Sequence, residues 1–345
     1  MQTELYQQFQ FALNSHLRID EISILRFIIP LVIVWVAIAF LNKFLRIVWR
    51  NVTLVKKKNS KAAQNIPNAL IASHSKVALS PLDIDNSHAR KYQIGKYMVQ
   101  TSSFSLHKNG GSQSEYEDRS AIGCQGLSCL RVAVADGTTE SLFSDVWAEL
   151  LVNDYINKGI ELFDHSNLEA IHKDFIQQTY QRIAEMPEIR HWAMYEKLER
   201  GTHATLAAIE FSTDNTVHLS AVGDSCIFWF DENNIEMLPE LHTEDFGISP
   251  DSICHIPKTW HNLRQKVITR EIEFNQSILF VLCTDALACW LAKETREKNN
   301  LSAWEEIIQL SDIAAFNQLI EKLRESKEIR NDDTTLVIVN ATLNV

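Results

Sequence analysis

The sequence lacks the cysteine spacing of a zinc site or a redox pair, because none of its six cysteines form a CxxC motif. Most of them lie in apolar runs, where a free cysteine acts as a small hydrophobic residue. This pattern argues against a disulfide framework and favours a reducing compartment. The sequence also lacks a basic stripe after residue 85, and its formal net charge is -11. Nucleic acid is therefore not expected as a partner.

The N-terminal region contains an apolar run without charge, residues 27–41, which residues 22–25 extend across Arg26. Together these residues number about 20, roughly the minimum for a helix that crosses a hydrocarbon core. Lysines and arginines follow the run, and the positive-inside rule then places the rest of the chain in the cytoplasm. A cleaved signal peptide and a buried core helix are the alternatives. The favoured interpretation is a single-pass membrane anchor at residues 22–42 in contact with lipid.

Composition and patterning divide the chain into four parts. Hydrophobic residues make up 46% of the 345 residues, so a sizeable core can form. We expect a short N-terminal segment (1–21), the membrane helix (22–42), a basic and polar linker (43–90) and a folded domain (91–345). No internal repeat is found.

Strand-like runs alternate with helical patterns throughout the folded domain. Four successive strand-like runs between residues 204 and 238 are separated by short turns, which favours antiparallel pairing. Helical spacing of apolar residues predicts helices that lie in blocks, at residues 141–158, 168–200 with a break at Pro187, 286–298 and 303–325. This arrangement favours the α+β class with a layered architecture.

Four acidic signals each adjoin one of the predicted strands. In chain order they are Glu117-Asp118, Asp136-Gly137, Asp285 and Asp332-Asp333. A carboxylate at the rim of a packed core costs desolvation energy unless a cation or a donor compensates it. Several such carboxylates in one chain suggest convergence on hard metal ions. Simpler roles stay open, with Asp136 or Asp285 as a helix N-cap and Asp333 as a turn residue.

Six motifs resemble, in the same order, those of the type 2C metal-dependent protein serine/threonine phosphatases. They are Glu117-Asp118, VAVADG ending at Asp136-Gly137, GTHATLAA at 201–208, AVGDS at 221–225, CTDAL around Asp285 and NDDTTLVIV at 331–339. The resemblance covers roughly residues 92–342. It implies a four-layer α-β-β-α sandwich of two antiparallel sheets flanked by helices. The loop-rich residues 239–275 lie where this family carries a variable flap beside the active site.

The resemblance also implies a chemistry, the hydrolysis of phosphoserine and phosphothreonine by water that two metal ions activate. The ions would be Mg²⁺ or Mn²⁺, which prefer carboxylate and water ligands. By resemblance, Asp136 would bridge the two ions and the Gly137 carbonyl would bind one of them. Asp285 and Asp332 would hold the other ion.

The remaining motif residues receive different interpretations. By resemblance Glu117 would act in catalysis by orienting metal-bound water, and Asp118 could serve an accessory third ion. Asp224 in AVGDS is also similar to the family, but we interpret it as a turn carboxylate that accepts backbone N–H bonds. His203 and His255 are interpreted as packing or surface residues.

Two departures from the family pattern concern the side of the site that would bind phosphate. Thr139 and Glu140 stand where the family has glycines, and their side chains would narrow the site. Gln113 stands where bacterial members commonly have a phosphate-binding arginine. Lys108 and Arg119 are the candidates to replace that arginine.

Two functions are therefore open. The first is a membrane-anchored phosphatase, facing the cytoplasm, that acts on a phosphoprotein substrate and opposes a Ser/Thr kinase. The second is a pseudophosphatase, a binding or scaffold domain that keeps the fold without turnover. A binding domain has no need for every ligand carboxylate, so the sequence favours the enzyme.

Overall fold

The computed structural model describes residues 89–125, 128–139, 141–231, 234–247, 250–298 and 300–343. The predicted N-terminal segment, the membrane helix at 22–42 and nearly all of the linker lie outside these residues. Within the described residues, none of the helices is both long and apolar enough to cross a membrane. The anchor therefore stays a prediction from the sequence.

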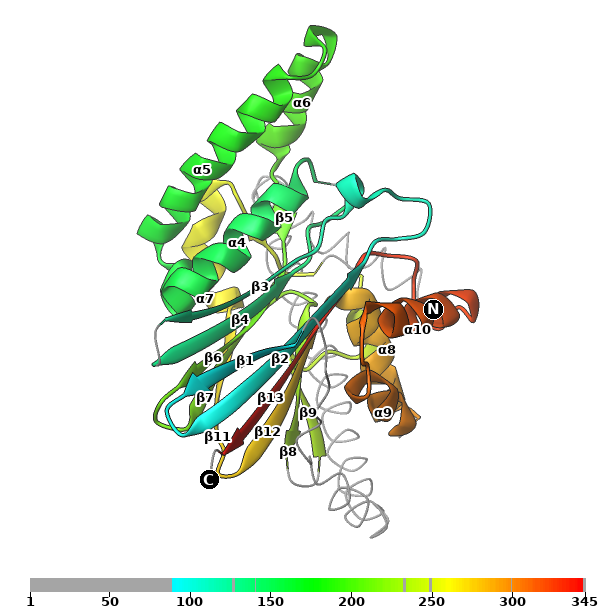
Figure 1. Cartoon of the computed structure of the whole chain (residues 1–345). Coiled ribbons are helices and arrows are strands. Elements are labelled where there is room, and N and C mark those ends of the chain that lie inside the picture. Colours follow the sequence, from blue (N-terminus) through cyan, green and yellow to red (C-terminus); the bar gives the residue numbers. More distant parts are fainter. Residues whose placement is uncertain are drawn as a thin grey trace, which may run out of the picture. The chain divides into compact units, whose positions relative to one another are not determined.

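Two antiparallel sheets form the centre of the folded domain (Figure 1). The six-stranded sheet has the order β1 (Arg90–Ile94), β2 (Tyr97–Leu106), β13 (Thr334–Leu343), β12 (Ser277–Cys283), β8 (Cys226–Asp231), β9 (Asn234–Leu238). The five-stranded sheet has the order β11 (Ile268–Glu273), β7 (Thr216–Val222), β6 (Leu206–Ser212), β4 (Cys129–Ala135), β3 (Arg119–Gln125). A small two-stranded sheet pairs β5 (His203–Ala204) with β10 (Ile253–Cys254).

Strand β4 shows why the central strands are apolar on both faces. Its residues Val132 and Val134 pack between the two sheets, in one apolar cluster with Phe280 of β12. The alternate residues Ala133 and Ala135 point to the opposite face and pack against helices. Because side chains alternate along a strand, burial on both sides requires an uninterrupted apolar run.

Helices cover the outer face of each sheet, as Figure 1 shows. Helix α4 (Ser144–Lys158) packs directly on the five-stranded sheet, α5 (His165–Ala184) packs against α4, and α6 (Glu188–Arg200) packs against α5. The short α7 (Leu263–Lys266) contributes to the same apolar cluster. On the six-stranded sheet lie α8 (Asp285–Arg296), α9 (Ser302–Ile308) and α10 (Ile313–Glu325). The α+β class and the four-layer arrangement of two antiparallel sheets between helices are thereby confirmed.

The helical pattern at residues 303–325 was expected to form one helix, and this prediction is wrong. The structure breaks it between α9 and α10, because Asp312 is the N-cap of α10 and its carboxylate accepts a hydrogen bond from Ala315 N at 2.8 Å. The expected break at Pro187 is confirmed, since α5 ends at Ala184 and α6 begins at Glu188.

The register of the five-stranded sheet brings two acidic motifs to one end of the sheet. Arg119, the first residue of β3, pairs with Ala135, the last residue of β4. Asp118 and Asp136 lie one residue beyond this pair. Both carboxylates therefore lie at the same end of the two strands.

The six-stranded sheet presents its acidic motifs in the same way. Cys283, the last residue of β12, pairs with Leu336 of β13 and with Cys226 of β8. Beyond this row lie Asp285 at the start of α8, Asp224 before β8 and the acidic pair before β13. Segments that are far apart in the sequence thus meet at one end of the sheet.

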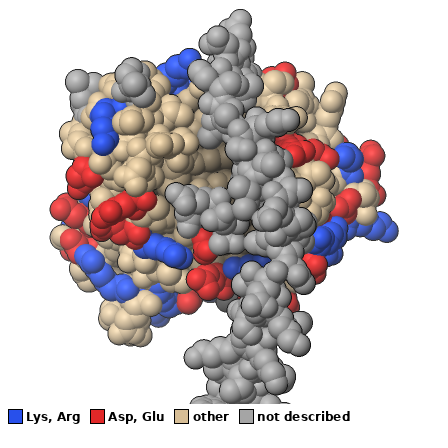
Figure 2. Space-filling model, turned by 90° about the horizontal axis from the view of Figure 1, so that it is seen from below, with Lys and Arg blue, Asp and Glu red and all other residues tan. Residues whose placement is uncertain are grey.

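Charged side chains are mixed in sign on the surface that Figure 2 shows. Among the described residues, Lys and Arg alternate with Asp and Glu over that face. This distribution differs from the continuous positive stripe of a nucleic-acid-binding surface.

Candidate metal centre

Three carboxylates converge at the end of the sheets. Asp136, Asp224 and Asp285 each offer one oxygen, and these oxygens lie within 4.8 Å of one another. The residues come from the end of β4, from the loop between β7 and β8, and from the first turn of α8. Oxygens at such separations can share divalent cations.

The backbone around Asp136 is fixed by Thr205. Asp136 N donates to Thr205 Oγ1 at 3.3 Å, and Thr205 N donates to the Asp136 carbonyl at 2.9 Å. Thr205 Oγ1 also lies 2.6 Å from Ser225 Oγ, the hydroxyl next to Asp224. This chain of hydrogen bonds holds two of the three carboxylates in one rigid group.

Asp224 is a candidate site residue that the sequence interpretation missed. It does accept backbone N–H bonds as expected, from its own residue in the turn and from Gly247 of the predicted flap at 3.3 Å. Its side chain is buried and belongs to the convergent group. The signal was present in the sequence, since Asp224 also follows an apolar strand and stands in a family motif.

Asp118 carries an oxygen for which the structure provides no protein donor. Its Oδ2 accepts a hydrogen bond from Thr284 Oγ1 at 2.8 Å, whereas its Oδ1 is buried without a partner among the described residues. Burial raises the pKa of Asp118 well above its usual range, and the nearby charges of Asp333 and Asp285 raise it further. A buried carboxylate oxygen without a donor requires a proton or a cation.

The three convergent carboxylates also have pKa values above their usual range. Burial raises the pKa of Asp136 well above its usual range, and Asp118, Asp285 and Asp224 add to the effect. Burial and the charge of Asp224 raise the pKa of Asp285 to about 7, although Arg330 opposes the rise. Burial also raises the pKa of Asp224. This group of hard oxygen donors therefore fits Mg²⁺ or Mn²⁺.

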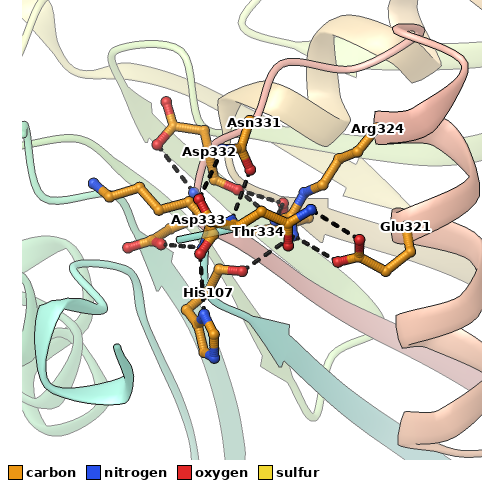
Figure 3. Close-up of polar contacts among 9 residues, drawn as sticks. His107, Glu321, Arg324, Asn331, Asp332, Asp333 and Thr334 are labelled. Atoms are coloured by element: carbon orange, nitrogen blue, oxygen red, sulfur yellow. Dashed lines mark hydrogen bonds and ion pairs between the residues drawn. The ribbon is translucent and has the colours of Figure 1, made fainter. Parts of the chain in front are cut away.

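Asp332 lies beside this group rather than within it. Its charge raises the pKa values of Asp136 and Asp285, which indicates proximity, but its carboxylate is not among the three convergent ones. Its Oδ1 accepts from Asp333 N at 3.0 Å, and its carbonyl accepts from Arg324 Nη2 at 2.7 Å (Figure 3). Its role as a ligand of the second ion stays a prediction.

Asp333 is not a simple turn residue. Its buried carboxylate accepts hydrogen bonds from the backbone N–H groups of Lys108, at 2.9 Å, and Glu117, at 2.7 Å. These bonds fasten the β2–β3 connection to the start of β13. Asp333 therefore sets the position of the Glu117-Asp118 motif relative to the other acids.

Glu117 is held at both carboxylate oxygens. Its Oε1 accepts from Ser144 Oγ at 2.6 Å, and its Oε2 lies 3.4 Å from Lys108 Nζ. The pKa of Lys108 is raised overall. Burial alone would lower it, but the negative charges of Glu117 and Asp333 outweigh burial. Ser144 also packs on Gly137, where an added Cβ would lie only 2.8 Å from Ser144 Cβ. Because glycine has no Cβ, residue 137 lets the first turn of α4 lie directly against the end of β4.

All three guanidinium nitrogens of Arg119 donate hydrogen bonds to protein acceptors. Its Nε donates to Glu149 Oε2 at 3.1 Å, and its Nη1 donates to the carbonyls of Tyr116 and Asp118, both at 2.7 Å. Its Nη2 donates to Asp145 Oδ2 at 3.3 Å. The guanidinium therefore fastens β3 to α4.

The structure describes the three positions that depart from the family pattern only in part. Gln113 lies in the short 3-10 helix Gln113–Glu115, but its side chain is not among those described. Glu140 lies outside the described residues, whereas Thr139 precedes it in a turn. The narrowing of the site by Thr139 and Glu140 therefore stays a prediction, as does the loss of a phosphate-binding cation at Gln113.

The sequence matches one known protein family over most of the folded domain. The sequence model of the family Protein phosphatase 2C matches residues 111–338. A search of curated proteins found no match. The chain therefore belongs to the protein phosphatase 2C family, and its class is that of the protein serine/threonine phosphatases.

Solved structures similar to this chain include RsbX and the serine/threonine phosphatases PstP and Stp1. RsbX in complex with magnesium shares 16% identity over 74% of this chain and 100% of its own, with a TM-score of 0.42. The catalytic domain of PstP in complex with 2 manganese ions shares 16% identity over 71% and 99%, with a TM-score of 0.45. Stp1 from Staphylococcus aureus shares 14% identity over 72% and 97%, with a TM-score of 0.46.

Proposed function

We propose that this chain hydrolyses phosphoserine and phosphothreonine in proteins with the help of two divalent ions, Mg²⁺ or Mn²⁺, and an accessory third ion. The observation that carries the proposal is the convergence of Asp136, Asp224 and Asp285 within 4.8 Å. The buried Oδ1 of Asp118 supports it, because this oxygen has no hydrogen-bond partner within the part of the chain that the structure describes.

The metal ions, when bound, would neutralise the transferring phosphoryl group and lower the pKa of the attacking water. Asp136 and the Gly137 carbonyl would hold one side of the site, and Asp285 with Asp332 would hold the other. Glu117 would orient the water, since Ser144 and Lys108 fix its two oxygens. Asp118 and Asp224 would serve the accessory ion.

Hydrolysis should depend on the metal. The full chain, freed of metal with EDTA, should release little phosphate from a phosphothreonine peptide or from p-nitrophenyl phosphate. Addition of Mn²⁺ should raise kcat/KM by at least about 100-fold, because the buried acids alone repel the anionic substrate. Phosphate release in a colorimetric assay measures the effect. Metal binding without turnover on either substrate would instead support the pseudophosphatase.

We also infer that residues 22–42 anchor the protein in a membrane, with the catalytic domain in the cytoplasm and near an opposing Ser/Thr kinase. The uncharged run at 27–41 and the basic residues after it support this inference. The full chain should stay with the membrane pellet after alkaline carbonate extraction, whereas a chain without residues 1–42 should be released. Release of the full chain would contradict the anchor.

A further inference from the structure

Arg330 lies at the edge of the acidic group, in the connection between α10 and β13. Its Nη2 donates a hydrogen bond to Asp285 Oδ2, and the two side chains form an ion pair. The Arg330 side chain keeps 48% of its surface exposed. A guanidinium therefore contacts a candidate metal ligand and also faces solvent.

Phosphate monoesters carry negative charge, and the acids of the site repel them. The positive charge of Arg330 lies directly against this group, since its guanidinium forms an ion pair with the Asp285 carboxylate. The two other basic candidates are engaged elsewhere: Lys108 pairs with Glu117, and Arg119 is bonded to α4 and to backbone carbonyls of the segment before its strand. Arg330 is thus the cation best placed to offset this repulsion.

The predicted flap leaves room for this guanidinium. Gly247 packs directly on it, so an added Cβ at 247 would lie 2.3 Å from Arg330 Nη1. Gly247 N also donates to Asp224 Oδ2 at 3.3 Å. The flap backbone and Asp285 therefore hold Arg330 in one orientation, with a single side-chain hydrogen bond among the described residues.

We propose that Arg330 binds the phosphoryl group of the substrate. A guanidinium presents five N–H donors in a planar fork, so one can stay on Asp285 while others donate to phosphoryl oxygens. Such paired, charge-assisted bonds would fix the phosphoryl group beside the acids. This role rests on the proposed hydrolytic function, and it supplies the substrate cation that Gln113 does not.

The test compares Arg330→Gln with Arg330→Lys in the full chain at saturating Mn²⁺. Arg330→Gln should raise KM for a phosphothreonine peptide and the inhibition constant of orthophosphate by about 10- to 100-fold, the worth of a charge-assisted bond. The change in kcat should be smaller. Arg330→Lys should recover part of both effects, because it keeps the charge and loses the fork.

Arg200→Gln is the matched control, since it removes an exposed arginine from an ion pair with Glu196 within α6. It should leave KM and orthophosphate inhibition unchanged. If Arg330→Gln also leaves both unchanged and only tightens Mn²⁺ binding, Arg330 is merely a counter-ion and the proposal is overturned.

Orthophosphate binding, measured by calorimetry on the Mn²⁺-loaded chain, separates the two proposals because it needs no turnover. If wild-type protein turns over substrate and Arg330→Gln binds orthophosphate as tightly as wild type, only the role of Arg330 is overturned. Wild-type protein that neither turns over substrate nor binds orthophosphate overturns the hydrolytic function as well. Orthophosphate binding that depends on Arg330 in a chain without turnover supports the binding role alone.

Discussion

Asp136→Asn is expected to lower kcat for a phosphothreonine peptide by at least about 1000-fold, a loss of roughly 4 kcal/mol in transition-state stabilisation. The asparagine keeps the size of the side chain but removes the charge at the centre of the acidic group. Burial and the charges of Asp118, Asp285 and Asp224 all act on this carboxylate, so it is the group best placed to share cations. Steady-state kinetics at saturating Mn²⁺ measure the loss.

Asp154→Asn is a suitable control for this variant. Asp154 pairs with Lys158 at 3.0 Å within α4, and neither residue belongs to the acidic group. The control should keep wild-type kcat, and both variants should keep the wild-type circular dichroism spectrum. A folded Asp136→Asn protein with wild-type kcat would show that this carboxylate does not act in the reaction.

Asp285→Asn is expected to stabilise the metal-free protein at pH 8, although it removes a candidate metal ligand. Burial and the charge of Asp224 raise the pKa of Asp285 to about 7 from the usual 3.8. The native state therefore keeps a proton that the unfolded chain releases. Stability from this group is complete below about pH 4 and is lost as the pH rises to about 7. The ionised carboxylate then costs on the order of 4 kcal/mol.

The expected result is a higher midpoint of thermal unfolding for Asp285→Asn than for wild type in EDTA at pH 8. The loss of the Arg330 ion pair offsets part of the gain. The difference should shrink as the pH falls toward 4, and Mn²⁺ should stabilise wild type more than the variant. Unfolding curves from pH 4 to 8, with and without Mn²⁺, measure these effects. If the variant is less stable than wild type in EDTA at pH 8, the ionised Asp285 does not destabilise the native state and the explanation is contradicted.

The sequence predicted the fold correctly where local patterns of residues determine the structure. The apolar run before Asp136 predicted a strand because both faces of β4 are buried. Pro187 marked the boundary of two helices because proline disfavours a helical conformation in the residue before it. Asp312 carried a comparable signal as an N-cap, but the apolar spacing on both sides concealed it.

The sequence predicted only part of the site, because the contacts that form it join segments far apart in the chain. The Thr284 hydroxyl that binds Asp118 comes from a residue 166 positions away, and Asp333 binds the backbone of Glu117 from 216 positions away. Asp224 was set aside because a short motif in a loop resembles an ordinary turn. Its role became visible only through its distance to the other carboxylates.

The convergent metal site is tested most directly by anomalous diffraction at the manganese edge, from crystals of the chain grown with Mn²⁺. Manganese peaks are expected within coordination distance, about 2.2 Å, of carboxylate oxygens of Asp136 and Asp285, with Asp224 contacting an accessory peak. Crystals without manganese at these carboxylates, or with manganese bound only elsewhere on the surface, would contradict it.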